Sequence, residues 1–504
     1  MEKELPIGWI LIQLGDLFLI ERGGSPRPIE DYITQAENGI NWIKIGDTKG
    51  LTKYIYKTKE KIKPEGLYKS RMVYEDDFIL SNSMSFGRPY IMKTSGCIHD
   101  GWLVIRPNKK IVDLNYLYYM LSSSFVYQQF SSLAKGSTVK NLNIVAVQQV
   151  YIYLPPLPEQ QRIVAKLDTL FGHLDALKTR LDRIPQLLKD FRQKVLTQAV
   201  TGKLTEGWRE GKEFNIEDEF LQIQKIKKKL QRSGEIKLQK LEPIKEEEII
   251  LKLFPIYWHL CVFDDLFSFI DYRGKTPTRT DSGVRLITAK NIKMGWLSDS
   301  PVEFMGEKVY KLWMTRGYPK INDLFFVTEG YTMGNVALNT FDFTFALAQR
   351  TLTLHPIYNI ESKFYMYVIL HSKYQILIDK NATGTAAKGI KAAKFKNLPV
   401  PFPPIEEQQE IVRRVESLFA KANLIEASYQ KLKTKIEQLP QALLAKAFRG
   451  ELVEQLPTDG NARELLEQIK LAKAGLEKGG RTKKIKENVE VRMVAEDGVR
   501  YGKK

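Results

Sequence analysis

The sequence predicts a mixed α/β protein in which two repeated globular domains are separated by two long antiparallel coiled-coil helices, related by a pseudo-twofold axis. Three observations lead to this prediction. The stretch LPPLPEQQRIV at 154–164 returns as FPPIEEQQEIV at 402–412, an offset of 248 residues (402 − 154). The two copies end at the same offset, as AVTGKL at 199–204 and AFRGEL at 447–452. Between these ends, apolar residues recur at alternating steps of three and four, which is typical of a coiled-coil seam.

The apolar seam keeps the same phase in both helices. In the first helix, the predicted seam or partner interface comprises Leu167, Leu170, Leu174, Leu177, Leu181, Leu188 and Val195. In the second helix it comprises Val415, Leu418, Ile425, Leu432, Ile436, Leu439 and Leu443. Two ordinary amphipathic helices on separate cores are the alternative, although such helices usually show a wider apolar stripe.

Apolar residues beside this seam are expected to stay open for the helices of a partner protein. They are Val164, Val195 and Leu196 in the first helix, and Val412, Leu443 and Leu444 in the second. A partner's helices would then complete a four-helix bundle. Burial of these residues within the chain itself is the alternative.

The composition limits the class of protein. With 504 residues and 43% hydrophobic content, the chain is expected to form more than one domain. Two cysteines argue against a disulfide framework and for a reducing, cytoplasmic location. The start MEKELPIGWI does not resemble a signal peptide, and no stretch approaches the ~18 apolar residues of a membrane span. Lys and Arg exceed Asp and Glu by 18 (77 − 59), which predicts binding to a polyanion such as nucleic acid.

In chain order, residues 1–154 form the first predicted domain, with strands over 41–45, 78–82, 90–93, 102–106 and 150–154 and a helix over 114–130. Residues 155–204 form the first coiled-coil helix, and 205–253 form a charged connector in which 222–231 can be helical. The second domain spans 254–402 and the second coiled-coil helix 403–452. Residues 453–504 are expected to form a basic, polar and partly disordered tail.

The two domains share landmarks but differ inside. LPIGW at 5–9 matches FPIYW at 254–258, and KGSTVK at 135–140 matches TGTAAK at 383–388. Between such landmarks the residues diverge strongly, while the helices agree. Two copies of one scaffold with different surfaces suggest two sites of one kind that read two different targets.

Prolines interrupt the symmetry of the helices. Residues 159–201 are expected to form one helix of roughly 65 Å, at about 1.5 Å per residue. Pro185 and Pro440 lie inside the two helices but not at the common offset. Each proline removes a backbone donor, so each is expected to bend its helix.

Motifs for catalysis and metal binding are not found. The chain has no Asn/Asp-Pro-Pro-aromatic sequence, and Gly274-Lys275-Thr276 is not a phosphate-binding loop because Phe269 replaces its first glycine. Cys97, His99, His259 and Cys261 do not occupy equivalent positions of the repeat and do not have the usual spacing of zinc ligands. The sequence therefore predicts a recognition protein that carries no catalytic site and no metal.

The motifs identify a family resemblance. The doubled Pro-Pro-x-x-Glu-Gln-Gln start, the heptad helix and the Ala-x-x-Gly-x-Leu end resemble those of the specificity subunit of type I DNA restriction–modification systems, over roughly residues 5–456. The resemblance implies two target recognition domains that each read one half of a bipartite, asymmetric site in double-stranded DNA. It implies that the helices set the gap between the two half-sites and bind two methyltransferase subunits. Motor-nuclease (restriction) subunits would then join this complex. S-adenosylmethionine would belong to the methyltransferase, and this chain would need no cofactor.

Candidate DNA-binding residues lie in polar loops. Base contacts are predicted for Ser81, Asn82, Ser83 and Arg88 in the first domain, and for Thr328, Tyr331, Asn335 and Arg350 in the second. Phosphate contacts are predicted for Lys135, Ser137, Thr138, Lys140, Thr385 and Lys388, although these loops could instead be helix caps without a ligand. Arg273 and Lys275, with Arg22, Arg27, Lys44, Arg279 and Lys290, are expected to hold phosphates or to serve solubility.

Two alternatives stay open. The chain could be the recognition subunit of a related system in which one partner protein carries out both methylation and cleavage. The sequence barely distinguishes such a subunit from a type I specificity subunit. The chain could also be a coiled-coil scaffold that joins two protein-binding domains. The basic excess and the matched Gly-Ser/Thr loops argue against the scaffold.

Overall fold

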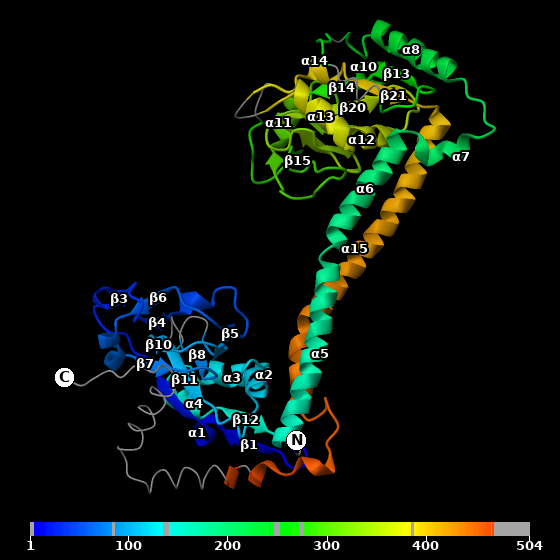
Figure 1. Cartoon of the computed structure of the whole chain (residues 1–504). Helices are drawn as coiled ribbons and strands as arrows, with labels where there is room; N and C mark the ends of the chain where they lie inside the picture. The colour runs from blue at the N-terminus through cyan, green and yellow to red at the C-terminus, as the bar shows by residue number, and fades with distance from the viewer. Residues whose placement is uncertain are drawn as a thin grey trace. The chain divides into compact units, whose positions relative to one another are not determined.

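The computed structural model describes residues 5–82, 86–134, 141–238, 240–245, 252–272, 277–384, 388–464 and 466–467 (Figure 1). The chain divides into two compact units. The first unit contains residues 1–181 and the chain from Leu432 onward, and the second contains residues 182–431. Each unit therefore combines one globular domain with parts of the long helices.

The first domain is built from three β-sheets. A two-stranded sheet pairs β1 (Ile10–Gln13) with β12 (Tyr151–Leu154). One five-stranded sheet has the order β2 (Leu19–Arg22), β11 (Trp102–Arg106), β8 (Phe78–Ser81), β9 (Pro89–Met92) and β5 (Tyr54–Ile55). The other has the order β3 (Ile33–Thr34), β6 (Glu60–Ile62), β4 (Ile40–Ile43), β10 (Gly96–Ile98) and β7 (Arg71–Val73).

Short helices complete the core of the first domain. They are α1 (Leu14–Leu17), α2 (Leu114–Leu121), α3 (Ser124–Leu133) and α4 (Ile144–Gln148). The predicted helix over 114–130 is thus two helices, because the Ser123 hydroxyl accepts a hydrogen bond from Val126 N and caps the second one. Asp113 caps α2 by accepting from Asn115 N and Tyr116 N. The buried side chains of α2 and α3 join those of β8, β11 and β12 in one hydrophobic core.

The second domain repeats this plan, but its two larger sheets have fewer strands. β13 (His259–Val262) pairs with β21 (Pro399–Phe402), as β1 pairs with β12. A four-stranded sheet has the order β14 (Phe267–Asp271), β20 (Thr351–Pro356), β17 (Leu324–Val327) and β18 (Val336–Leu338). A three-stranded sheet has the order β16 (Phe304–Met305), β15 (Val284–Ile287) and β19 (Phe345–Leu347). The helices are α10 (Phe263–Leu266), α11 (Glu307–Trp313), α12 (Ser362–Leu370), α13 (Ser372–Asn381) and α14 (Ala392–Phe395).

The long helices differ between the two halves of the repeat. The first half forms α5 (Leu157–Leu181) and α6 (Ile184–Val200), whereas the second forms one helix of 43 residues, α15 (Ile405–Ala447). The prediction of one helix over 159–201 is therefore wrong. Pro185 lies in the first turn of α6, where its missing N–H costs nothing, and its ring would clash with a continuing turn before it. Pro440 stays inside α15.

Within the second unit, α6 and the first half of α15 run antiparallel. Arg414 Nη1, near the start of α15, donates to Leu204 O after the end of α6 at 2.8 Å. Arg192 Nη2, in the middle of α6, donates to Glu426 Oε2 further along α15 at 2.7 Å. Within the first unit, Ile163 and Leu167 of α5 share the hydrophobic core with Leu444 and Ala447 near the end of α15.

The connector packs on the second domain. It contains α7 (Glu206–Arg209) and α8 (Ile216–Arg232), and the latter covers the predicted helical stretch 222–231. Phe220 of α8 packs against His259 with ring centroids 4.2 Å apart and the rings tilted by 34°, and Ile223 is fully buried. Lys227 forms an ion pair of 2.7 Å with Asp264. One face of α8 thereby covers the edge of the domain that begins with β13.

A buried glutamate anchors each domain to its long helix. In the first unit, Trp9 Nε1 donates to Glu159 Oε2 of α5 at 2.9 Å. In the second unit, Trp258 Nε1 donates to Glu407 Oε2 of α15 at 3.0 Å. Both carboxylates are fully buried. The repeated Glu-Gln-Gln motif therefore has a structural role at this junction.

The next residue of the motif adds a second anchor. Gln160 Oε1 accepts from Asp113 N at 2.9 Å, and its Nε2 donates to Pro155 O at 2.9 Å. Gln408 Oε1 accepts from Glu361 N at 3.0 Å, and its Nε2 donates to Pro403 O at 2.8 Å. Each amide thus links the start of α2 or α12 to the Pro-Pro turn before the helix.

The conserved glycine of each helix end makes a close contact with the other repeat's domain. Gly202 follows α6 with φ of 66°, and a Cβ there would lie 3.0 Å from Pro255 Cγ. Gly450 follows α15 with φ of 71°, and a Cβ there would lie 2.5 Å from Pro6 Cγ. Only glycine combines this left-handed conformation with the absence of a side chain. Each domain is therefore held by the start of its own helix and by the end of the other.

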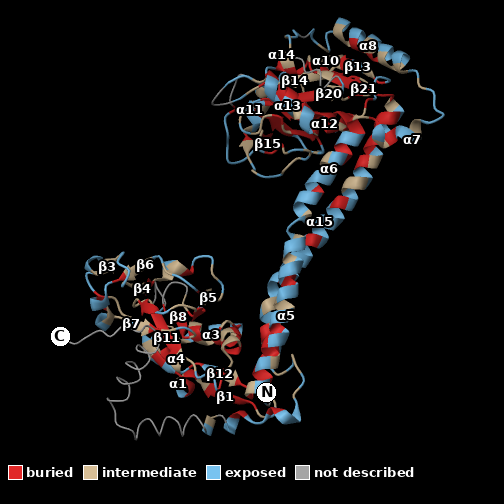
Figure 2. Cartoon of the chain, viewed as in Figure 1, coloured by how far each residue is buried: buried red, intermediate tan, exposed pale blue. Residues whose placement is uncertain are grey.

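Buried and exposed residues alternate along the long helices (Figure 2). Among the described residues, no helix is both long enough and apolar enough to cross a membrane.

The two buried glutamates should respond differently to neutralisation. Glu407 Oε1 accepts from Thr205 Oγ1 at 2.7 Å and also pairs with Arg209, so Glu407→Gln should destabilise the second unit by about 3 kcal/mol. Glu159 Oε1 has no hydrogen-bond partner among the described residues. Glu159→Gln should therefore change the free energy of unfolding by no more than about 1 kcal/mol. Chemical denaturation of both variants measures the difference.

The buried carboxyl of Glu159 also predicts a dependence of stability on pH. Burial raises the pKa of the Glu159 carboxyl above its ordinary value. Because the folded state then holds this proton more tightly than the unfolded state, the contribution of Glu159 to stability should fall as pH rises from about 4.3 through the raised pKa. The stability difference between wild type and Glu159→Gln, followed across that interval, should change in this direction. A constant difference would contradict the assignment.

Candidate nucleic-acid interface

Three segments of the second domain converge beyond the end of β17. Thr328 N donates to Arg350 O at 2.9 Å, and Thr328 Oγ1 donates to the same oxygen at 3.1 Å. Gly330 N donates to Lys388 O at 2.9 Å. We name residues 328–331, 349–350 and the described part of 383–390 the second-domain loop cluster. It brings together four predicted site residues: Thr328, Tyr331, Arg350 and Lys388.

Side chains in this cluster differ in their access to solvent. Tyr331 is fully exposed, and the side chains of Arg350 and Glu329 are 52% and 48% exposed. Lys388 is exposed and forms an ion pair of 2.8 Å with Asp379. These side chains can reach a ligand without a change of fold.

Two predicted base contacts of the second domain instead bind the protein. Thr328 is buried, and its hydroxyl is used by the Arg350 carbonyl. Asn335 Nδ2 donates to Ile292 O at 2.9 Å, across to the segment that follows β15. In this conformation they position the loops, because their polar groups serve internal hydrogen bonds.

The first domain shows the same correction. Ser81 and Asn82 were predicted to contact bases, but both are buried. The Ser81 hydroxyl accepts from Arg88 N at 3.2 Å, and Asn82 Nδ2 donates to Asp100 O at 2.8 Å. Arg88 is exposed, with its guanidinium 5.7 Å from the centre of the Tyr90 ring. Of the described residues in this domain that were predicted to contact bases, only Arg88 presents its side chain to solvent.

A groove near Asp100 supplies exposed cations that the base-contact prediction missed. The groove, of about 680 Å³, is lined by residues including Ser25, Arg27, Trp42, Lys44 and His99. The Arg27 side chain is 80% exposed and lies 3.5 Å from an oxygen of Asp100. The sequence signal was the glycine turn at 23–24 with its flanking arginines, which was assigned to phosphates or solubility.

Two titratable groups of this groove have shifted pKa values. The Ser25 hydroxyl, which donates to Asp100 Oδ1 at 2.8 Å, lowers the pKa of that carboxyl. Burial lowers the pKa of His99. At neutral pH a charged Asp100 therefore lies beside Arg27, and the groove itself is lined by a neutral His99 and by Lys44, which pairs with Glu60.

Eight further predicted DNA contacts lie outside the described residues. They are Ser83, Lys135, Ser137, Thr138, Lys140, Arg273, Lys275 and Thr385. Over the part of the chain that is described, no group of three or more His, Cys, Asp or Glu residues could hold a metal ion.

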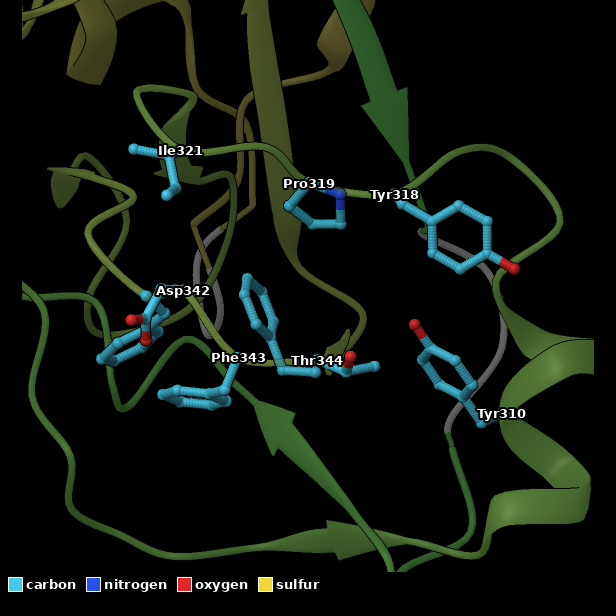
Figure 3. A pocket seen from close by; sticks show the side chains of 9 residues that line it. Tyr310, Tyr318, Pro319, Ile321, Asp342, Phe343 and Thr344 are labelled. Carbon is cyan, nitrogen blue, oxygen red and sulfur yellow. The ribbon is translucent and has the colours of Figure 1, made fainter.

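An aromatic cleft of the second domain lies apart from the loop cluster. Figure 3 shows Tyr310, Tyr318, Phe343 and Asp342 around this cleft of about 250 Å³. The cleft is lined by 318–321, before β17, whereas the loop cluster follows the other end of this strand. None of the predicted DNA-binding residues lines it.

The predicted seam of the long helices separates into two lines. One line, at seven-residue spacing, is buried except at Leu181 and Leu443, and its buried members are Leu167, Leu174, Leu188 and Val195 in the first half, and Val415, Ala422, Tyr429 and Ile436 in the second. The other line is more open: Leu177 is 45%, Ile425 53%, Leu432 48% and Leu439 39% exposed. Leu170, Leu181, Leu418 and Leu443 are intermediate.

The flanking residues expected to stay open are instead covered by the chain itself. Val164, Val195, Leu196, Val412 and Leu444 are at most 7% exposed, and Leu443 is intermediate. They join the cores at the helix ends, where the domains pack, and so the open apolar surface lies along the middle of the helices.

Comparisons with known proteins agree on one family. A family model described as the type I restriction modification DNA specificity domain matches residues 6–186 and 316–434. The EcoBI specificity subunit of *Escherichia coli* is 29% identical over 480 residues, covering 92% of both chains. The EcoKI specificity subunit of strain K12 is 27% identical over 509 residues, covering 94% of this chain and 97% of that one.

A solved structure shares the fold. The crystal structure of the HsdS subunit from *Thermoanaerobacter tengcongensis* aligns with a TM-score of 0.58 and 18% identity, over 89% of this chain and 99% of that one. The chain belongs to the type I restriction–modification DNA specificity family, and its function is that of a specificity subunit, which recognises DNA.

Lys388 should contact a phosphate in a sequence-independent manner. Its exposed ammonium pairs with the surface carboxylate of Asp379 and is free to exchange that carboxylate for a DNA phosphate. Lys388→Gln should weaken binding to all duplexes by a similar factor and reduce the slope of log K against log salt by about 1. Titrations of cognate and unrelated DNA at several salt concentrations measure this. A loss confined to one sequence would assign Lys388 to a base instead.

Proposed function

We propose that this chain selects DNA by reading two different half-sites, one with each globular domain, and that it catalyses no step itself. The observation that carries this proposal is the repeated scaffold with divergent exposed loops. The first domain presents Arg27, Asp100 and Arg88, whereas the second presents Arg350, Glu329 and Tyr331. Different donors and acceptors on one scaffold suit an asymmetric site of two parts.

The long helices would set the gap between the half-sites. An uninterrupted helix of 43 residues is about 65 Å long, and equivalent major-groove faces recur roughly every 34–36 Å. A helical separator of this length can therefore span more than one turn of DNA.

The same helices would bind two methyltransferase subunits, to which restriction and motor subunits add. The open apolar residues Leu177, Leu432 and Leu439 of the first unit support this assignment, because a helix pair in water gains by covering such residues. Methyl transfer and its cofactor S-adenosylmethionine would belong to the methyltransferase.

A methylation map tests the DNA-recognition proposal. A methylation-free host that expresses this chain with its neighbouring methyltransferase should acquire methyl groups at a motif of two short parts with a fixed gap. The control host lacks only this chain and should show no such motif. A continuous motif, or the same motif in the control, would reject the proposal.

Substitutions along the helices test the partner surface. Leu432→Glu and Leu439→Glu place charges on the open line, so they should abolish copurification of the methyltransferase and leave the melting temperature within a few degrees of wild type. Ile436→Ala, on the buried line, should lower the melting temperature, because it costs about 2–5 kcal/mol of packing. Full binding by both glutamate variants would show that the partner docks elsewhere.

A further inference from the structure

Arg350 adopts a backbone conformation that arginine avoids. Its φ is 77°, and the other described non-glycine residues with positive φ are Asp76 and Asn322. Asp and Asn tolerate the left-handed region because their short polar side chains bond locally, but arginine gains no such compensation. A strained residue of this kind persists where the surrounding structure enforces it, and such residues cluster at functional sites.

The ion pair of Arg350 does not explain this strain. Arg350 Nε lies 2.9 Å from Glu329 Oε1, and the two side chains are 52% and 48% exposed. Ion pairs this open to solvent contribute little to stability. Folding stability alone therefore gives no reason to keep arginine at this position.

The neighbouring loop fixes the arginine in place. Both the backbone N–H and the hydroxyl of Thr328 donate to Arg350 O, at 2.9 and 3.1 Å. Since Glu329 follows Thr328 directly, the carboxylate and the guanidinium are held beside each other by the same contact. The pair is thus preorganised before any ligand arrives.

The orientation of the pair leaves its reading groups free. Glu329 Oε1 lies beside Nε, while the two terminal nitrogens of Arg350 have no hydrogen-bond partner among the described residues. Two parallel N–H donors match the O6 and N7 acceptors of guanine in the major groove. The second carboxylate oxygen of Glu329 is likewise without a described partner and can accept from cytosine N4.

We propose that Arg350 and Glu329 together read one G·C base pair in the half-site of the second domain. Arg350 donates to guanine O6 and N7, and Glu329 accepts from N4 of the paired cytosine. The inference rests on the proposed function, and it adds the identity of one base pair and a residue, Glu329, that reads it.

The carboxylate itself favours a base over a phosphate as the ligand. A glutamate beside an arginine repels the DNA backbone and weakens sequence-independent binding. Within the same cluster, Lys388 supplies a cation for phosphate. A carboxylate at this edge gains most where it meets a base donor, and cytosine N4 is such a donor.

The first domain has a related but different arrangement. There, the carboxylate of Asp100 lies 3.5 Å from the terminal nitrogen Nη2 of Arg27, whereas in the second domain the carboxylate lies beside Nε. The two domains therefore present arginine differently, as an asymmetric target requires.

Binding to duplexes with single base-pair changes tests the inference on the full chain with its methyltransferase. With wild type, replacing one G·C pair of the second half-site by A·T should reduce affinity roughly five- to hundredfold. Arg350→Gly should remove this discrimination at that pair alone. Glu329→Gln should relax the same pair, because an amide donates as well as accepts. The first half-site and the gap should be unchanged in both variants.

Loss of folding is excluded by the choice of variants. Glycine relaxes the left-handed backbone, so Arg350→Gly should melt no lower than wild type. Asn322→Gly is the matched control, since it removes a similar conformation (φ 73°) at the other end of β17 and should leave every base preference intact.

Two results would overturn the inference while leaving the proposed function standing. One is a bipartite wild-type motif whose second half-site contains no required G·C pair. The other is unchanged discrimination at every position in Arg350→Gly. If wild type itself yields no bipartite motif, the proposed function fails first, and the base-pair assignment falls with it.

Discussion

The architecture depends on a buried carboxylate at the first turn of each long helix. Glu159 and Glu407 each bind a tryptophan from the beginning of a domain. The glutamine that follows each of them binds the Pro-Pro turn and the start of α2 or α12. A buried carboxylate is costly without donors, so the surrounding chain must supply them in a fixed geometry. The two junctions solve this differently: Glu407 has Arg209 and Thr205, whereas among the described residues Glu159 has no cation within hydrogen-bond distance. The repeat thus preserves the junction but not the balance of charge around it.

The sequence revealed the parts of the fold that depend on periodicity. Helices with a seven-residue repeat and strands ended by Gly or Pro carry local signals, so the two scaffolds and their order could be predicted. The break at 182–183 was placed as a bend, because a proline in the first turn of a new helix and one inside a helix look alike in sequence. Which of the two lines of the seam is buried depends on how the long helices of this chain pack together, and the spacing of the apolar residues alone does not determine it.

The site was harder to predict than the fold because exposure is a tertiary property. Ser81 and Asn82 have the composition of a binding loop, yet the segment around Asp100 and Leu142 covers them. Conversely, Arg27 was assigned no specific role, although its side chain is among the most open in the groove. Glu329 was not among the predicted site residues, because a single glutamate forms no recognisable sequence motif. Its significance arises only from the distant arginine that β20 brings beside it.

The two units also differ in the order in which a ribosome supplies their parts. The second unit is one continuous stretch, residues 182–431, so its whole chain is available as soon as that stretch has emerged. The first unit begins with residues synthesised before that stretch but includes Leu444 and Phe448 in its core and Asp459 beside Arg162, all synthesised after it. The N-terminal domain must therefore wait, with part of its apolar surface uncovered, while some 250 residues are translated. Of the two, the domain that is made first is completed last, and termination after residue 431 would deprive its core of Leu444 and Phe448 while leaving the other unit whole.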